Sequence, residues 1–180
     1  MRHPTSIRHI CLFIAASFAP LATASLPLGQ LAPELELKGE SGSTINEEAW
    51  SSKSLTGKVH MLVYSTVGAK DLNNETTEAI KKAEFSKDAF ASIAVINMKS
   101  SWQPNFMINR ALTAKQKEYP NTLYVRDLQN VLVKQWSLAD HSNDLVLFDK
   151  TGRVVFSVDG ELKKEQREEL LKLIGEKIKN

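Results

Sequence analysis

Two apolar runs on either side of an amphipathic segment place the strongest constraint on the fold of this chain. Residues 58–65 (KVHMLVYS) and 91–97 (ASIAVIN) are apolar along most of their length, as expected of strands buried on both faces of a sheet. Between them, residues 74–85 carry apolar side chains at helical spacing. A strand, a helix and a second strand in this order predict two parallel strands joined by a right-handed crossover.

The later part of the chain extends this unit. Residues 106–119 have a helical pattern that ends before a proline, and residues 122–125 form a further short strand. Residues 128–136 predict a turn and a short helix. Residues 144–160 hold two apolar strands around a Lys-Thr-Gly turn, which indicates a β-hairpin.

The two ends of this region complete the predicted fold. Residues 34–38 alternate apolar and polar side chains and residues 43–46 follow after two glycines, which predicts a second hairpin. Residues 161–179 place their apolar side chains near one stripe of a helix. The order of elements predicts an α/β, three-layer sandwich with a mixed central sheet, helices on both faces and an N-terminal β-hairpin.

Residues 1–24 have the pattern of a secretory signal peptide. Two arginines precede an apolar run at 10–22, and the run ends in the small residues ATAS. This run is too short to cross a membrane, which needs roughly 20 apolar residues. We therefore predict cleavage between Ala24 and Ser25, and an exported periplasmic protein in which residues 25–180 form one domain with no stable membrane anchor.

The chain has one cysteine, Cys11, and it lies inside this leader. A lipidated cysteine would follow the apolar run rather than stand at its start, so we reject a lipoprotein. After cleavage no thiol remains, which excludes a disulfide, a thiolate nucleophile and a thiolate metal site. Thiol oxidoreductase or peroxidase activity is therefore not expected.

Cleavage also changes the charge balance. Removing 24 of the 180 residues takes away two arginines and no acid, so the 23 basic residues become 21, equal to the 21 acidic residues. A net charge of zero gives no strong attraction for nucleic acid or acidic lipid. We predict an unknown periplasmic protein or a small ligand as the partner, no nucleic acid, and no cofactor or metal.

Several stretches resemble known exported proteins. The segments at 32–46, 57–65, 119–138 and 143–160 resemble peroxiredoxin-like and periplasmic thioredoxin-like domains. More closely, the leader and the stretches LTGKVHML, RALTAKQKEYPNT and VLFDKTGRVVFSVDG resemble the YtfJ family of exported bacterial proteins. The resemblance implies a thioredoxin-like fold and a periplasmic location. It implies no particular activity, because that family is functionally uncharacterised.

The sequence departs from the thioredoxin pattern where that pattern carries its chemistry. Aligned on Lys70, the two cysteine positions fall on Thr66 and Ala69, and a hydroxyl has neither thiolate character near neutral pH nor the ability to form a disulfide. The cis-proline position before the late hairpin falls on Asn143 or a neighbour, and no proline is present there. The resemblance thus implies a redox fold without its redox groups.

Polar residues remain near this corner. Asp140 and His141, with the serine and aspartate nearby, include the residue types of a hydrolase triad, but neighbours in sequence point in different directions and a polar loop is the simpler interpretation. A zinc site built on His141 is weak, since zinc usually takes more nitrogen or sulfur ligands. The backbone amides after Thr66, with Lys70, would attract an anion if a helix opens there, although Asp71 competes as its cap.

Two further residues have two possible roles each. Trp102 and Phe106 lie in or beside a loop containing serines and a proline, where they either contact a partner or close the edge of the core.

His60 lies inside an apolar strand, and we interpret it as structural.

Two functions remain open from sequence alone. The first is a non-catalytic binding or adaptor module. The alternative is a non-thiol enzyme, or a protein that binds a small ligand or anion at the corner around Thr66, Lys70 and His141. The candidate ligand or partner patch consists of Thr66, Lys70, Trp102, Asp140, His141 and Asn143.

Overall fold

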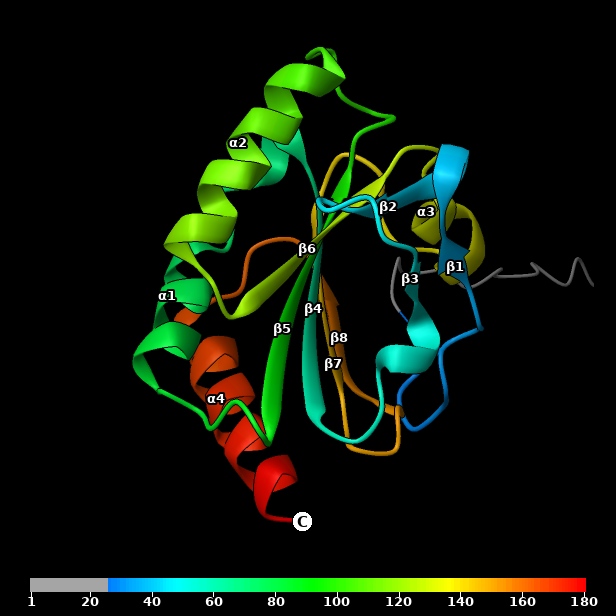
Figure 1. Ribbon diagram of the computed structural model, residues 1–180. Helices are drawn as coiled ribbons and strands as arrows, with labels where there is room; N and C mark the ends of the chain where they lie inside the picture. Colours follow the sequence, from blue (N-terminus) through cyan, green and yellow to red (C-terminus); the bar gives the residue numbers. More distant parts are fainter. Residues whose placement is uncertain (1–25) are drawn as a thin grey trace, which may run out of the picture.

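A computed structural model describes residues 26–180 and shows a mixed six-stranded sheet between two outer layers (Figure 1). In spatial order the strands are β2 (Gly42–Thr44), β6 (Thr122–Asp127), β5 (Phe90–Asn97), β4 (Val59–Thr66), β7 (Asn143–Phe148) and β8 (Val154–Asp159). The leader, Cys11 and the cleavage site predicted at Ala24–Ser25 lie outside the described residues.

The predicted strand–helix–strand unit is confirmed. β4 and β5 pair in parallel over their full length, from Val59 opposite Phe90 to Thr66 opposite Asn97. They are joined by α1 (Asn74–Lys82), and α2 (Asn105–Glu118) joins β5 to the next parallel strand, β6. The carboxyl ends of β4, β5 and β6 therefore meet at one edge of the sheet.

Helices α1, α2 and α4 (Lys164–Lys179) cover one face of the sheet (Figure 1). Leu170 and Ile174 of α4 are fully buried against Met61 and Leu145 of the sheet. Burying one such aliphatic side chain contributes roughly 1.5–3 kcal/mol. The apolar stripe predicted from the sequence is thus the face by which α4 packs.

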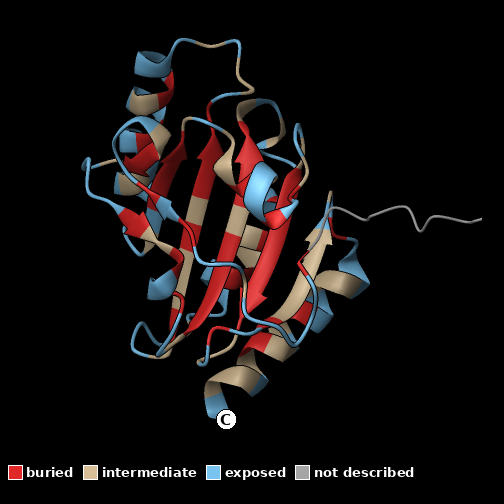
Figure 2. Ribbon diagram, turned by 90° about the vertical axis from the view of Figure 1, so that its right-hand side faces the viewer, coloured by how far each residue is buried: buried red, intermediate tan, exposed pale blue. Residues whose placement is uncertain are grey.

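The opposite face is covered by α3 (Val131–Trp136) and by a small sheet of β1 (Glu36–Leu37) and β3 (Trp50–Ser51). The Trp136 ring lies 6.5 Å from that of Trp50 and 6.0 Å from that of Phe148, and its indole N–H donates to the Pro33 carbonyl at 2.7 Å. Packed layers on both faces confirm the three-layer α/β sandwich (Figure 2).

The N-terminal antiparallel pair is present, but its second strand differs from the one the sequence indicates. β1 pairs with β3, and β2 pairs with the distant β6. A 3₁₀ turn at 39–41 follows β1, and Gly42 then lies so close to β6 that a Cβ there would stand 2.0 Å from the Arg126 carbonyl oxygen. Gly42 has a φ of +149°, which favours glycine. The glycine that suggested a hairpin turn instead permits this close approach.

Among the described residues, no helix has the length and apolar character needed to cross a membrane.

Candidate functional site

Polar side chains gather where the parallel strands end. Thr66 ends β4, Asn97 ends β5 and Asp127 ends β6, while Asn143 and Asp144 begin the antiparallel β7. All five residues are buried. This edge, with the loops that cover it, is where the sequence places the candidate site.

Thr66 is held inside this edge. Its backbone N–H donates to the Ser142 carbonyl at 3.3 Å, and the residue is only 4% exposed. The following residues, Val67–Ala69, form a single 3₁₀ turn. The hydroxyl that stands where the thioredoxin pattern has a cysteine is therefore not presented on the surface.

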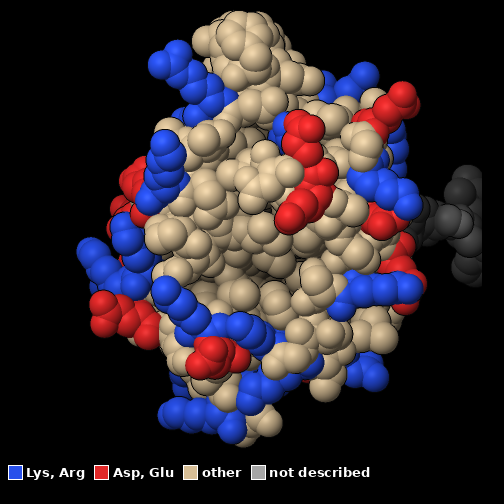
Figure 3. Space-filling view, in the orientation of Figure 1, with Lys and Arg blue, Asp and Glu red and all other residues tan. Residues whose placement is uncertain are grey.

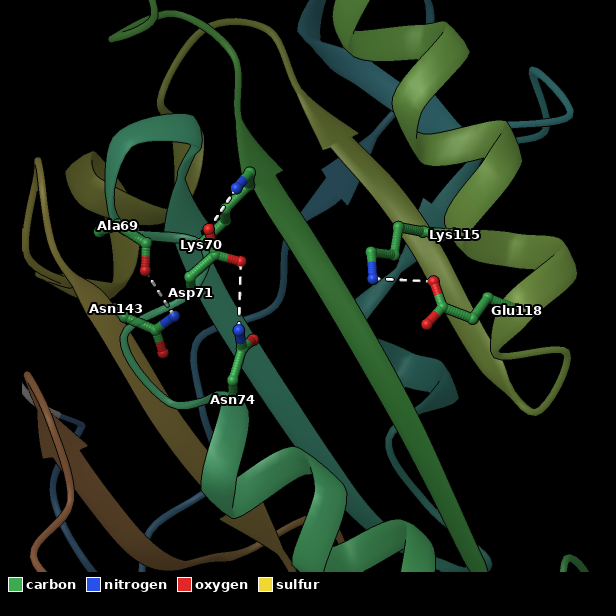
Figure 4. A network of polar contacts seen from close by, with 7 residues as sticks. All are labelled: Ala69, Lys70, Asp71, Asn74, Lys115, Glu118 and Asn143. Atoms are coloured by element: carbon green, nitrogen blue, oxygen red, sulfur yellow. Dashed lines mark hydrogen bonds and ion pairs between the residues drawn. The ribbon is translucent and has the colours of Figure 1, made fainter.

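The helix begins at Asn74, as the sequence predicts, and residues 67–69 form a 3₁₀ turn. No α-helix therefore opens directly after Thr66, which was the condition for an anion site there. Lys70 lies on the surface, where its ammonium group binds the Asp71 carboxylate, and the Asn74 side-chain amide donates to the same carboxylate at 3.3 Å (Figure 4). Both charged side chains are more than half exposed, so this pair adds little stability.

Asn143 acts as a structural bridge. Its side-chain amide donates to the Ala69 carbonyl at 3.2 Å, which ties β7 to the turn after β4 (Figure 4). Its side-chain oxygen accepts from the Asn73 amide at 3.0 Å, and Asn73 also donates to the Gly160 carbonyl and accepts from the Leu162 N–H, both at 2.9 Å. A buried amide network thus fixes the position that a proline holds in the thioredoxin pattern.

Asp140 joins two loops over the polar edge. Its Oδ1 accepts from the Ser100 hydroxyl at 2.6 Å and from the Asn97 amide at 3.0 Å. The backbone N–H of His141 donates to the same oxygen at 3.0 Å. The carboxylate is therefore engaged in holding the loop at 98–101 against the loop that precedes β7.

The residue types of a hydrolase triad do not converge. The His141 side chain is 72% exposed, and its Nε2 stands 3.8 Å from Asp140. The Ser142 hydroxyl donates to Asp159 and makes no hydrogen bond to His141. Within residues 26–180, no group of three or more histidine, cysteine or acidic residues is arranged to hold a metal ion. The polar-loop interpretation fits this geometry.

Asp127 was not among the residues singled out from the sequence, yet it organises the edge. Its carboxylate accepts from the backbone N–H groups of Val131 at 2.9 Å and Leu132 at 3.0 Å, which caps α3, and from the Tyr64 hydroxyl at 3.2 Å. Burial and the Asp127 charge both raise the pKa of Tyr64 far above its usual value. This carboxylate is structural.

Asp144 is the second buried carboxylate of the edge, and it has fewer donors. It accepts from one backbone N–H, that of Ala139, at 3.1 Å. Burial raises the pKa of Asp144 to about 7, and the negative charge of the neighbouring Asp159 adds to the shift. Asp144 is thus a titratable group near neutral pH, enclosed within the fold.

The described structure exposes Trp102 rather than packing it into the core. Trp102 is 90% exposed, Phe106 is 73% exposed and Met107 is 50% exposed. We call these three residues the apolar tip. They lie in the loop before α2 and in its first turn, at the end of the molecule where Figure 3 shows an uncharged, convex knob. The outer face of α2 continues from this tip as a shallow hollow of about 490 Å³.

Some of the buried polar residues of the edge can be predicted from their positions beside apolar runs in the sequence. Asn97 and Asp127 end the strands β5 and β6, and the carboxyl ends of parallel strands meet at one edge of a sheet. Asp144 stands at the start of the apolar run that forms the antiparallel β7. Asn73 has no comparable signal, because its partners at 143, 160 and 162 come from distant parts of the chain.

Comparison with known proteins identifies the family and the fold. The family described as "Bacterial protein of unknown function (YtfJ_HI0045)" matches residues 26–177. The chain is similar to the uncharacterized protein YtfJ of Escherichia coli strain K12, with 30% identity over 135 residues that cover 73% of each chain.

Two solved structures, one named as a protein disulfide isomerase and one as a thioredoxin, share the fold. A candidate protein disulfide isomerase from Bacteroides thetaiotaomicron matches with a TM-score of 0.63 and 18% identity, covering 89% of this chain and 96% of that one. The pneumococcal exposed lipoprotein thioredoxin Etrx1 from Streptococcus pneumoniae matches with a TM-score of 0.54 and 18% identity, covering 78% of this chain and 99% of that one. At this identity the likeness shows a thioredoxin-like fold and nothing of the activity.

Proposed function

This chain belongs to the YtfJ family of bacterial proteins of unknown function, and we propose that it is a non-catalytic binding module of the periplasm. It has a thioredoxin-like fold, and its single cysteine, Cys11, lies in the predicted leader. The observation that carries the proposal is the apolar tip, which stands beside a polar edge whose groups already bind one another.

The exposure of the apolar tip supports binding. The two other tryptophans, Trp50 and Trp136, are only 3% and 2% exposed. Trp102 is therefore the exception, a tryptophan whose side chain lies in solvent rather than in the core. Removing apolar surface from water is favourable by roughly 25 cal/mol per Å². An exposed cluster of aromatic and thioether side chains therefore favours contact with another molecule.

The polar edge gives the enzyme alternative less support. Asp140 is engaged by Ser100 and Asn97, Ser142 binds Asp159, and Lys70 binds Asp71. A catalytic base needs a nucleophile within hydrogen-bond reach, and His141 has no such neighbour among the described residues. These observations favour binding over chemistry at this corner.

Two observations support export: the leader sequence, and an exported protein among the solved structures with a similar fold. Residues 1–24 have the order of a secretory signal peptide, and the similar Etrx1 is named as an exposed lipoprotein. We propose that residues 25–180 are the processed protein, folded as one domain.

Photo-crosslinking in living cells tests the binding surface. We would place a benzophenone amino acid at position 102 and, as the control, at the exposed Lys82 on α1. Adducts from position 102 that are absent from position 82 are the expected result. Equal labelling from both positions, or no adduct with either protein or lipid from position 102, would overturn the proposed surface.

Native mass spectrometry of the protein purified from the periplasm tests the alternative. A copurifying small molecule that His141→Ala or Lys70→Ala releases would favour the ligand-binding function at the corner. Retention of all copurifying mass in both variants, with its loss in Trp102→Ser, is the outcome expected of the proposed function.

A further inference from the structure

We propose that the apolar tip binds the surface of a bilayer containing anionic phospholipid and inserts Trp102 and Phe106 among the head groups. This inference rests on the proposed function, because it names what occupies the surface proposed there. It concerns reversible contact of the folded protein with a membrane surface, for which no membrane-spanning helix is needed.

The shape of the apolar tip fits a flat, soft surface. Trp102 and Phe106 are exposed at an end of the molecule that is convex in Figure 3, and hydrogen bonds hold the loop that carries Trp102. Met98 at its base is buried, the Ser101 N–H donates to the Met98 carbonyl at 3.3 Å, and the Gln103 N–H donates to the Ser101 hydroxyl at 3.1 Å. Aromatic side chains held outward in this way are suited to the membrane–water interface.

The charge around the apolar tip complements an anionic surface. The stretch from Met98 to Lys117 contains four basic residues and no acid, although the chain from Ser25 onward has no net charge. Lys99, Arg110 and Lys117 form no ion pair with any residue the structure describes. A basic side chain close to an anionic bilayer strengthens binding roughly fivefold.

The outer face of α2 extends the same surface. The hollow beside the tip is lined by Phe106, Met107, Arg110, Ala111 and Ala114, which include one cation and no acid. A helix face that combines apolar and basic side chains is typical of helices that lie along a lipid surface.

Acidic groups do lie near the apolar tip and α2, but none of them lines this hollow. Asp140 accepts from the Ser100 hydroxyl in the loop before α2, and Glu118 at the end of α2 pairs with Lys115. Glu40 lines a separate hollow with Lys99 and Asn105, and Glu47 reaches toward Arg126, which hydrogen-bonds Asn109 of α2. The acid-free side is therefore the outer one, and we place it against the bilayer.

The same geometry favours lipid over a folded protein as the occupant. A stable protein interface buries about 800 Å² on each partner, and its aromatic anchors fill pockets. Here the aromatic side chains are exposed at a convex end of the molecule, and the neighbouring hollow is shallow. A fluid interface accepts such a knob without a matching pocket.

Vesicle binding of the chain from Ser25 onward tests this proposal. Because Trp50 and Trp136 are buried, a change in tryptophan emission on binding reports Trp102. We expect a shift to shorter wavelength, and cosedimentation, with vesicles of equal parts phosphatidylcholine and phosphatidylglycerol. Phosphatidylcholine alone is expected to give neither, and salt is expected to weaken the binding.

Matched variants separate the tip from overall charge. The double variant Lys99→Gln/Arg110→Gln is expected to lower the partition coefficient roughly 30-fold, since each cation contributes about fivefold. Lys82→Gln/Lys179→Gln removes the same charge from exposed positions on α1 and α4 and is expected to leave partitioning unchanged. Trp102→Ser is expected to abolish both the emission shift and cosedimentation.

Three results would overturn the proposal: no binding to the anionic vesicles, equal binding to phosphatidylcholine, or equal loss in the two double variants. Protein adducts from position 102 without vesicle binding would assign the surface to a protein partner and leave the proposed function standing. The absence of both adducts and vesicle binding would remove the proposed function as well.

Discussion

The two buried aspartates of the polar edge differ in how their charge is compensated. Asp127 accepts from the Tyr64 hydroxyl and from backbone N–H groups at the start of α3, whereas Asp144 accepts from the Ala139 N–H alone. A buried carboxylate with few donors is stabilised in its protonated form. Asp144 is therefore a residue that makes the free energy of unfolding depend on pH near neutrality.

Asp144→Asn tests this link. Because the pKa of Asp144 is about 7 in the folded state and near 3.9 in an unfolded chain, the folded protein holds a proton that the unfolded chain has lost between these values. The protonated Asp144 therefore adds to the free energy of unfolding at low pH. This stabilisation, on the order of 2–4 kcal/mol, is lost as pH rises through 7. Urea unfolding from pH 5 to 8 should show this fall in the wild type and not in Asp144→Asn.

The difference between the two unfolding curves isolates Asp144. Burial lowers the pKa of His60, so its effect on stability is opposite to that of Asp144. The free energy of unfolding falls as pH drops below the pKa that His60 has in the unfolded chain. His60 is present in both proteins and cancels in the difference. Parallel curves for the wild type and Asp144→Asn would show that Asp144 does not hold a proton in the folded state.

Asn73 and Asn74 offer a matched pair for the amide network. Asn73→Ala removes buried hydrogen bonds to Asn143, Gly160 and Leu162 and leaves their groups without partners, so we expect a loss of about 2–4 kcal/mol in the free energy of unfolding. Asn74→Ala removes one exposed contact to Asp71 and should cost less than about 1 kcal/mol. Equal losses in urea unfolding would contradict a structural role for the network.

At the scale of elements, the sequence predicts those parts whose signal is local. The long apolar runs of β4 and β5 and the Lys-Thr-Gly turn between β7 and β8 carry their structure in neighbouring residues, and these elements form as expected. The N-terminal pairing differs because β1, β2 and β3 have only two or three residues each. Their partners are decided by contacts with distant strands.

The candidate site is less predictable because its contacts also join distant parts of the chain. The sequence placed Thr66 and Asn143 in a candidate ligand or partner patch; the fold buries both and uses Asn143 as a bridge. The bond from the Leu162 N–H to Asn73 spans 89 residues, and no local pattern announces it. Of the two possible roles of Trp102, its 90% exposure argues against closing the core, and partner contact stays a prediction.

Gly42→Ala tests how β2 reaches the sheet. A methyl group at this position would meet the Arg126 carbonyl oxygen at 2.0 Å, and its φ of +149° is unfavourable for alanine. We expect the free energy of unfolding to fall by about 2–4 kcal/mol. Gly68→Ala, which meets open space, should stay within about 0.5 kcal/mol. A harmless Gly42→Ala would mean that β2 does not pack this closely on β6.

At the scale of the whole molecule, charge and apolar surface are unevenly distributed. The chain from Ser25 onward is neutral in sum, yet its acid-free stretch coincides with the exposed Trp102 and Phe106 at the end of the molecule that also carries the polar edge (Figures 1 and 3). In the thioredoxin pattern, this edge holds the reactive cysteines. Here its groups maintain the fold, and the proposed contact moves to the neighbouring loop and α2.

The predicted cleavage site lies next to the first buried residue of the fold. Leu26 is buried in the core, and its N–H donates to the Ser157 hydroxyl at 2.9 Å. A cut between Ala24 and Ser25 would leave a single residue ahead of this anchored position. Intact mass spectrometry of periplasmic protein should give the mass of residues 25–180, with no thiol labelled by maleimide and no change in unfolding midpoint with dithiothreitol.

A variant that blocks cleavage supplies the control. Ala22→Arg/Ala24→Arg removes the small side chains that a signal peptidase requires, so the chain should keep its leader and remain with the membrane fraction. That unprocessed chain retains Cys11 and should react with maleimide. Wild-type protein that also retains Cys11 would contradict the cleavage site, and the protein could then no longer be regarded as thiol-free.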